Sequence, residues 1–301
     1  MIRIIETGLR STVQDAGRFG HLRSGIPPAG PADPVALRAA NALVDNEDGA
    51  AVIEIVGLPF RFSCDDRRMV AATGRDVTLT IRGRLPGWAS VFVRGGETVT
   101  VNGGPNTRYA YVAIGGGIAT EPVLGSRATY LPAGIGGVLR ASDALALGAS
   151  SAGADRAARA IEPPPYDGRV RAIAGPHDDR FAPDATARFF GAEFHVDAAS
   201  DRQGTRLVGP PVVPRPGELL TCGVIAGAVQ VPRGGAPIVL LADHQTTGGY
   251  PVIATVIEAD LGKVAQAIPG EALRFYRVER AEALEVLRAE RRALAGSRAS
   301  V

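Results

Sequence analysis

The sequence of 301 residues has little lysine, cysteine or tryptophan and no long apolar run. Lys263 is its only lysine, so arginine carries nearly all of the positive charge. The formal net charge of +2 gives no electrostatic reason to expect binding to nucleic acid or to an acidic membrane surface. No apolar run reaches the roughly 20 residues of a membrane-spanning helix, and the N-terminus lacks the apolar core of a signal peptide. We therefore expect a cytoplasmic protein that contacts neither nucleic acid nor a membrane.

Two cysteines and four histidines offer little material for a metal site. Cys64 and Cys222 lie too far apart for a zinc framework of paired cysteines. Free thiols packed as small apolar side chains are the expectation for a chain of this size, and a single disulfide is the alternative. No His-Glu-x-x-His pattern occurs among the histidines, so we predict no metal.

Glycine and proline are abundant and separate many short apolar runs. In residues 77–81, apolar Val77, Leu79 and Ile81 alternate with threonines, which is the period-two pattern of a half-buried strand. Further strands are predicted at residues 68–73, 109–114, 138–139, 169–174, 194–198, 226–231 and 237–242. Many short strands with few helices predict a mainly β architecture, either a barrel or a sandwich.

Helical patterns are few. Asp33 can cap a helix that begins at Pro34. Other helices are predicted at about residues 179–190, 257–267 and 280–294, the last with leucines along one side of a heavily charged segment. Residues 149–168 are small, polar and then proline-rich, which predicts a linker between β-rich halves at 1–148 and 169–301. A surface excursion within one domain is the alternative.

Two glycine-flanked segments in the first half contain polar groups. Residues 11–20 hold Thr12, Gln14, Asp15 and Arg18, which could converge on a ligand; a turn in which Asp15 and Arg18 pair with each other is the alternative. The three glycines at 115–117 could cradle an anion through backbone N–H groups, although no nucleotide-binding motif occurs. Arg127 in the following GSRATY segment could bind a carboxylate, and a structural turn with a surface arginine is the alternative.

In the second half, His177 precedes Asp178 and Asp179. This triplet could be a proton shuttle or metal ligand, but we favour the interpretation that one of the aspartates caps the following helix. The pair Asp201-Arg202 lies in a glycine-closed segment where a self-paired turn is the alternative.

Residues 242–251, ADHQTTGGYP, follow an apolar strand and form the strongest candidate, because loops at strand ends often carry function. Asp243 beside His244 could tune a general base near neutral pH, and two glycines would let a ligand approach the backbone. The alternative is a polar turn in which His244 bonds to a main-chain carbonyl. No Gly-x-Ser-x-Gly elbow supports a serine hydrolase.

The same segments resemble the biotin-dependent carboxyltransferase-like family, also called allophanate hydrolase subunit 2. The resemblance covers residue 1 to about residue 276, and its motifs are TVQDAGRFGHLRSGIPPAGPAD, GIATEPVLGSRATYLPAGIGG and GAVQVPRGGAPIVLLADHQTTGGYPVIATV. It implies a cyclophilin-like β-barrel architecture with a few peripheral helices and two barrel-like halves. Within the family, the chain resembles the branch that holds the C subunit of 5-oxoprolinase.

That resemblance implies a hetero-oligomeric enzyme. A KipI-like B subunit and an A subunit would act with this chain to hydrolyse 5-oxo-L-proline to L-glutamate while ATP is hydrolysed. The chain has no nucleotide motif and no biotinylation segment, so ATP would be used through another polypeptide and we expect no cofactor bound to this chain. The alternatives are carboxyl transfer from biotin to urea or a small amide, and a non-catalytic, KipA-like protein that binds a KipI-like partner.

The resemblance also implies a set of site residues. The DHQTTGGY cluster motivates the hypothesis that Asp243 and His244 are catalytic, with Asp243 orienting the imidazole, and that Arg18, Arg127 or Arg202 holds the substrate carboxylate. The residues implied in substrate binding are Gln14, Asp15, Arg18, Ser126, Arg127, Asp201, Arg202, Gln245 and Tyr250. At residue 203 the family usually has methionine where this chain has glutamine, so this loop departs from the family pattern.

Overall fold

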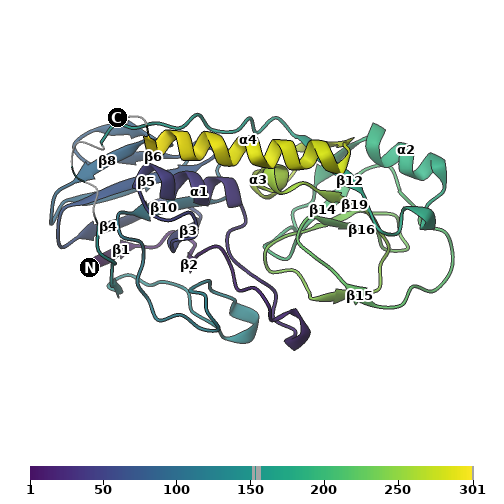
Figure 1. Cartoon of the computed structure of the whole chain (residues 1–301), viewed down its shortest axis with the longest axis horizontal. Coiled ribbons are helices and arrows are strands. Elements are labelled where there is room, and N and C mark those ends of the chain that lie inside the picture. The colour runs from purple at the N-terminus through teal and green to yellow at the C-terminus, as the bar shows by residue number, and fades with distance from the viewer. Residues whose placement is uncertain (151–152, 154–156, 300–301) are drawn as a thin grey trace. The chain divides into compact units, whose positions relative to one another are not determined.

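The computed structural model describes residues 1–150, 153 and 157–299, and within them the chain forms two compact units (Figure 1). Unit 1 contains residues 1–18, 29–164 and the chain from Arg291 on, and unit 2 contains residues 19–28 and 165–290. The mainly β architecture with a closed barrel confirms the predicted fold class. Residues 151–152 and 154–156 of the predicted linker lie outside the described residues, and the predicted domain limits stay a prediction.

Unit 1 consists of two antiparallel sheets that share one apolar core. Their orders are β11-β1-β4-β9-β6-β7 and β2-β3-β10-β5-β8. The strands are β1 (Ile2–Glu6), β2 (Arg10–Gln14), β3 (Val52–Val56), β4 (Phe60–Cys64), β5 (Arg68–Gly74), β6 (Thr78–Thr80), β7 (Arg84–Pro86), β8 (Ser90–Val93), β9 (Thr98–Asn102), β10 (Ala110–Ile114) and β11 (Ala144–Leu145). Buried Ile4 and Phe62 from the first sheet join Ile53 and Val112 from the second in one cluster. Burial of this apolar surface is the main stabilising contribution.

The other face of the five-stranded sheet carries a row of buried polar side chains. Thr12, Glu54, Tyr111 and Thr73 are cross-strand partners on β2, β3, β10 and β5. The Tyr111 hydroxyl donates to Glu54 Oε2 at 2.9 Å and accepts from the backbone N–H of Asp33 at 2.8 Å. Thr73 Oγ1 donates to the carbonyl of Ala36 at 2.7 Å. The row therefore fixes the start of the helix that covers this face.

That helix, α1 (Pro34–Leu43), confirms the predicted start. Asp33 is its N-cap and accepts from the N–H of Ala36 at 3.0 Å, and Pro34 is the first helical residue. Figure 1 shows α1 lying across β10 and β5.

The predicted strand at 138–139 is wrong, because Val138 makes only an isolated bridge to Thr12.

Unit 2 is a closed barrel of seven strands in the order β12-β19-β16-β17-β14-β13-β20, and β12 and β20 pair in parallel. The strands are β12 (Arg169–Ala174), β13 (Glu193–Val196), β14 (Gly204–Val208), β16 (Ala228–Gln230), β17 (Ile238–Leu240), β19 (Val252–Val256) and β20 (Ala272–Arg277). A separate ribbon joins β15 (Cys222–Gly223) to β18 (Thr247–Gly248). Phe189 stacks on Phe275 with ring centroids 4.7 Å apart, which seals α2 (Pro183–Gly191) against β20.

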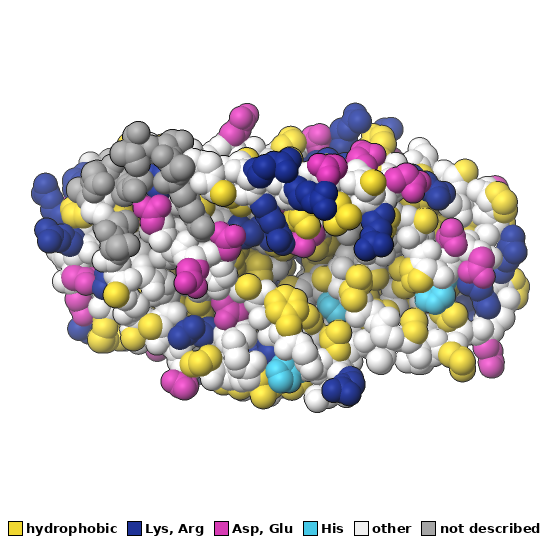
Figure 2. Space-filling model, in the orientation of Figure 1, with side chains coloured by type: hydrophobic (Ala, Val, Ile, Leu, Met, Phe, Trp, Pro, Cys, Tyr) yellow, Lys and Arg dark blue, Asp and Glu magenta, His cyan; other side chains and the backbone are white. Residues whose placement is uncertain are grey.

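The helices that follow β12 lie close to their predicted places. Helix α3 (Glu258–Gln266) is fixed to β12, because Arg171 donates to both carboxylate oxygens of fully buried Asp260. In helix α4 (Arg280–Ala299), residues 280–296 carry the expected mixture of positive and negative side chains (Figure 2). No helix in the described ranges is long and apolar enough to cross a membrane.

The predicted aspartate cap of α2 is wrong. The N-cap of α2 is Ala182, and Asp178 and Asp179 belong to a preceding 3-10 turn, η4 (Asp178–Arg180). Pro183 starts the helix because its fixed φ suits the first turn and its missing N–H needs no cap.

Candidate functional site

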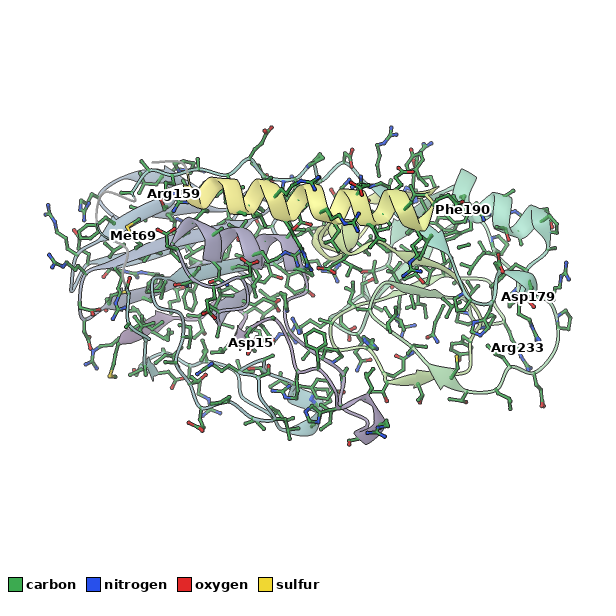
Figure 3. The ribbon with its side chains drawn as sticks, viewed as in Figure 1. Asp15, Met69, Arg159, Asp179, Phe190 and Arg233 are labelled. Atoms are coloured by element: carbon green, nitrogen blue, oxygen red, sulfur yellow. The ribbon has the colours of Figure 1, made fainter. Side chains whose placement is uncertain are left out.

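Asp15, labelled in Figure 3, follows β2 and connects the end of this strand to the loop at residues 123–129. Its Oδ1 accepts from the Ser126 hydroxyl at 2.6 Å and from the N–H of Gly17 at 2.9 Å. Its Oδ2 accepts from the backbone N–H of Arg127 at 2.6 Å. Asp15 therefore shapes the backbone on both sides of the candidate residues Ser126 and Arg127.

Arg18 is 1% exposed and serves the same loop. Its Nε donates to the carbonyl of Val123 at 2.9 Å, and its Nη2 donates to those of Ser126 at 3.3 Å and Ala128 at 2.7 Å. Burial lowers the pKa of Arg18, and the charge of Asp15 opposes this shift. The guanidinium is thus bound mainly to backbone carbonyls rather than engaged in the alternative turn in which Asp15 and Arg18 pair.

Gln14 lies beside these residues and is also 1% exposed. Its Nε2 donates to Thr12 Oγ1 at 3.1 Å and to the carbonyl of Thr129 at 3.2 Å. In the described part of the chain, Gln14 Oε1 and Arg18 Nη1 are buried without a hydrogen-bond partner. A buried polar atom without a partner costs about 1–3 kcal/mol of stability. One such acceptor and one such donor lie within five residues of each other, which makes this segment a candidate for binding a polar ligand.

Arg127 lines a cavity of about 390 Å³ in unit 1. Its Nε donates to the carbonyl of Thr120 at 2.6 Å, and its two terminal nitrogens have no partner among the described residues. The cavity lies between the chain after α1 and the loop after β10, and its lining includes Asp45, Asn46, Glu47, Gly116, Gly117 and Ser150.

The predicted anion cradle at the three glycines is wrong. Their N–H groups donate to the carbonyl of Met69, to Asn46 Oδ1 and to the carbonyl of Ile114, each at 2.8 Å. Because these donors are already satisfied inside the protein, they are not available to a ligand. Asn46, which sequence reasoning did not single out, holds this loop.

In unit 2, Arg202 and Asp243 form a buried ion pair. Arg202 Nε and Nη2 donate to the two carboxylate oxygens of Asp243, both at 2.8 Å, with side-chain exposures of 7% and 12%. Asp201 instead accepts from the N–H groups of Gln203 at 2.8 Å and Gly204 at 3.3 Å, and closes its own turn. The self-paired alternative for Asp201 and Arg202 is therefore not the arrangement found.

His244 is 1% exposed, and its Nδ1 lies 2.6 Å from the carbonyl oxygen of Gln245. A carbonyl only accepts, so Nδ1 carries the hydrogen and Nε2 keeps its lone pair in the neutral ring. Burial lowers the pKa of His244, while this hydrogen bond and the charge of Asp243 act in the opposite direction. The imidazole is oriented by a main-chain carbonyl, as in the alternative interpretation, whereas the Asp243 carboxylate is occupied by Arg202.

The rest of the loop at 242–251 connects to the barrel wall through Gln230, which sequence reasoning missed. Gln245 Nε2 donates to Gln230 Oε1 at 2.8 Å, and Gln230 Nε2 is buried without a partner in the described ranges. Gly248 lies so close to Gln230 Nε2 that an added Cβ would overlap it. Tyr250 is 49% exposed.

Unit 2 also has a cavity, of about 630 Å³, which lies at the start of α2. Its lining includes Arg215, Arg277, Asp179 and Phe190. The last two are labelled in Figure 3. His177 Nδ1 accepts from the N–H of Val252 at 3.2 Å, which is a structural role. No cluster of three or more His, Cys, Asp or Glu suited to a metal occurs in the part of the chain that the structure describes.

The candidates thus form two groups, each assembled within its own unit. Asp15, Arg18, Gln14, Ser126 and Arg127 come together in unit 1, and Arg202, Asp243, His244 and Gln245 come together in unit 2. A family profile described as "Carboxyltransferase domain, subdomain A and B" matches residues 24–277.

The chain belongs to this carboxyltransferase domain family. It is 36% identical to the C subunit of 5-oxoprolinase from Escherichia coli K12, over 97% of this chain and 96% of that protein. It is 34% identical to the protein of the same name from Haemophilus influenzae, over 96% and 94%. Among solved structures, urea carboxylase of Kluyveromyces lactis matches with a TM-score of 0.87 and 26% identity, over 98% of this chain and 29% of that one.

Proposed function

We propose that this carboxyltransferase-family chain is the C subunit of an ATP-dependent 5-oxoprolinase. The observation that carries the proposal is the identity of 34–36% to two proteins of that name over nearly their whole lengths. Similarity to urea carboxylase covers only 29% of that larger chain. In the proposed reaction, water cleaves the ring amide of 5-oxo-L-proline; the carbonyl carbon gains oxygen, the nitrogen gains a proton, and L-glutamate results.

Two further polypeptides complete the proposed enzyme. A B subunit of the KipI-like kind and an A subunit would assemble with this chain, and the A subunit would supply the ATP chemistry. No Gly-x-x-x-x-Gly-Lys phosphate loop occurs in this sequence, which is in keeping with that division of labour.

His244 is the proposed acid–base group. With Nδ1 donating to a carbonyl, a neutral ring offers Nε2 as proton acceptor, and burial favours the neutral form. Arg202 and Asp243 act as positioning residues, because their ion pair holds the loop that carries His244. Such a proton transfer contributes about 10²–10⁴-fold in rate.

The direct test is reconstitution. The chain is co-expressed with its B- and A-type partners, and ATP-dependent release of glutamate from 5-oxo-L-proline is measured with and without this chain. Glutamate formation that requires all three polypeptides supports the proposal. A stable complex of the three polypeptides without turnover would reject it.

His244→Gln and His195→Gln then test the acid–base role separately. His195 is exposed on β13 and serves as the matched control. Loss of turnover only in His244→Gln supports the role, whereas full turnover in both variants removes His244 from the mechanism and leaves the assignment of the chain to 5-oxoprolinase intact.

Carboxyl transfer is the second candidate function, and the fold agreement with urea carboxylase favours it. A biotin-bearing partner would then supply the carboxyl group to urea or a small amide. Co-purification of a biotinylated polypeptide, together with transfer of labelled carboxyl to urea, would establish this function in place of the first.

A further inference from the structure

Arg18, Arg127 and Arg202 are the candidate ligands for a carboxylate. In the structure these three arginines differ in how many of their N–H groups already have a partner within the protein. Arg18 gives its Nε and Nη2 to three backbone carbonyls and is 1% exposed. Arg202 gives its Nε and Nη2 to Asp243. A guanidinium binds a carboxylate strongly when two of its N–H groups face it in parallel, so neither side chain is free for that geometry.

Arg127 is in a different state. Its backbone N–H is held by Asp15 and its Nε by Thr120, at 2.6 Å each, so both the main chain and the inner part of the side chain are fixed. The pair of terminal nitrogens has no partner in the described ranges. A guanidinium held in this way loses little conformational entropy when it binds an anion.

The cavity beside Arg127 is shaped for a small molecule. Its volume of about 390 Å³ falls within the usual size of ligand pockets. Gly116 and Gly117 have φ of +95° and +70°, and a Cβ on Gly116 would overlap the carbonyl oxygen of Gly148. Glycine therefore keeps this wall free of side chains.

The charged side chains on the cavity wall suggest a ligand that carries both an anionic group and a hydrogen-bond donor. Asp45 is already paired with Arg159 Nη1 at 2.7 Å. Glu47 is exposed, and no hydrogen bond of its carboxylate occurs among the described residues. The same cavity is therefore lined by the terminal nitrogens of Arg127 and by the carboxylate of Glu47, neither of which has a hydrogen-bond partner among the described residues.

We propose that this cavity binds a small carboxylate whose neighbouring carbon carries an N–H group. The ligand carboxylate lies on the terminal nitrogens of Arg127, and its N–H group donates to Glu47. The inference rests on the proposed function, under which 5-oxo-L-proline and L-glutamate both have this chemistry. Asp15 is then a positioning residue for Arg127.

Binding to the isolated full chain, measured by titration calorimetry, tests the proposal without turnover. The probes are 5-oxo-L-proline, L-glutamate and 2-pyrrolidinone, which has the ring amide but no carboxylate. We expect at least one of the two carboxylates to bind and 2-pyrrolidinone not to bind. The carboxylate that binds more tightly identifies the cavity as a substrate site or a product site. Equal affinity for 2-pyrrolidinone, or no binding of either carboxylate, would overturn the proposal.

Arg127→Gln is expected to weaken carboxylate binding about 10- to 100-fold, as loss of charged hydrogen bonds does. Arg84→Gln, on exposed β7, is the matched control and should bind like the wild type. Equal affinities for the two variants would contradict the proposal. If Arg127→Gln does not fold, phenylglyoxal labelling of the wild type replaces it: ligand should slow modification of Arg127 but not of Arg84, and no protection would overturn the proposal.

The outcome is separable from that of the proposed function. Glutamate formation by the assembled complex without Arg127-dependent binding would overturn the cavity assignment and leave the function. Arg127-dependent binding without turnover would support the cavity assignment and reject the function.

Discussion

Arg202 and Asp243 bind each other through both side chain and backbone. Two N–H groups of the guanidinium donate to the two carboxylate oxygens at 2.8 Å, and the N–H of Asp243 donates to the carbonyl of Arg202 at 2.9 Å. The pair joins the turn before β14 to the loop after β17. His244 is the next residue, so this contact decides where the imidazole lies.

Breaking this pair should destabilise the protein. We expect Arg202→Gln to lower the free energy of unfolding by about 3 kcal/mol, because a mostly buried carboxylate is left without its cation. Urea denaturation measures the change. Arg274→Gln removes the exposed ion pair with Glu193, where the arginine side chain is 58% exposed, and should cost less than about 1 kcal/mol. If the two substitutions lower the free energy of unfolding equally, the buried Arg202–Asp243 pair stabilises the protein no more than the exposed pair does.

The stability of the protein should depend on pH through His244. Burial lowers its pKa below the ordinary value of 6.5, so the unfolded chain takes up the proton at higher pH than the folded chain. The contribution of His244 is complete above about pH 6.5 and is lost as the pH falls towards the folded pKa. Urea unfolding at several pH values between about 5 and 8 should show a smaller loss of stability on acidification in His244→Gln than in the wild type.

His195→Gln, which changes an exposed histidine, is the control for the replacement of a histidine by glutamine. The interpretation fails if His244→Gln loses stability on acidification just as the wild type does. A proton titration followed by NMR would locate the His244 pKa directly.

The two adjacent glycines of the 242–251 loop should respond differently to alanine. In Gly248→Ala the new Cβ overlaps Gln230 Nε2, so Gln230 must move and its bond to Gln245 is disturbed. We expect a loss of about 1–3 kcal/mol in stability, as for overpacking elsewhere. In Gly249→Ala the nearest atom is Thr221 Oγ1 at 3.6 Å, an ordinary contact. Thermal unfolding of both variants checks this, and a larger effect at Gly249 would contradict the described geometry.

The two thiols should differ in reactivity. Cys64 is fully buried on β4, and burial raises the pKa of its thiol to about 11, so almost no thiolate is present at neutral pH. Cys222 is partly exposed. Ellman's reagent should therefore titrate one thiol in the native protein and two in denaturant. Cys222→Ser should abolish the native reaction, whereas rapid reaction of both thiols in the native wild type would contradict the buried position of Cys64.

Sequence reasoning succeeded where the signal is local. The helix start at Asp33-Pro34 depends on a cap three residues from its donor, and the alternation at Val77, Leu79 and Ile81 predicted a strand that the structure has at Thr78–Thr80. It failed where two local signals compete. Asp178 and Asp179 are good caps, but Pro183 sets the start of α2 a few residues later.

Sequence reasoning also failed to identify buried polar side chains that bond to distant residues. The hydrogen bonds of Glu54 and Tyr111 hold the start of a helix, and that of Gln230 holds the 242–251 loop. Each of these residues lies in a strand, where the neighbouring residues in the sequence do not indicate its partner. Hydrophobic periodicity reports which face of a strand is buried, not which distant side chain meets it.

The sequence by itself determined the strand-rich character of the protein, the start of α1, the polar segments and the resemblance to the carboxyltransferase family. Only the tertiary structure decided which of those polar groups are already engaged. Arg18 meets carbonyls more than a hundred residues away, and Arg202 meets Asp243 across 41 residues. The two terminal nitrogens of Arg127, beside the cavity, meet no partner among the residues that the structure describes. The reason is physical: a guanidinium's partners are set by strand pairing that brings distant loops together, and nothing in the residues next to it encodes that pairing.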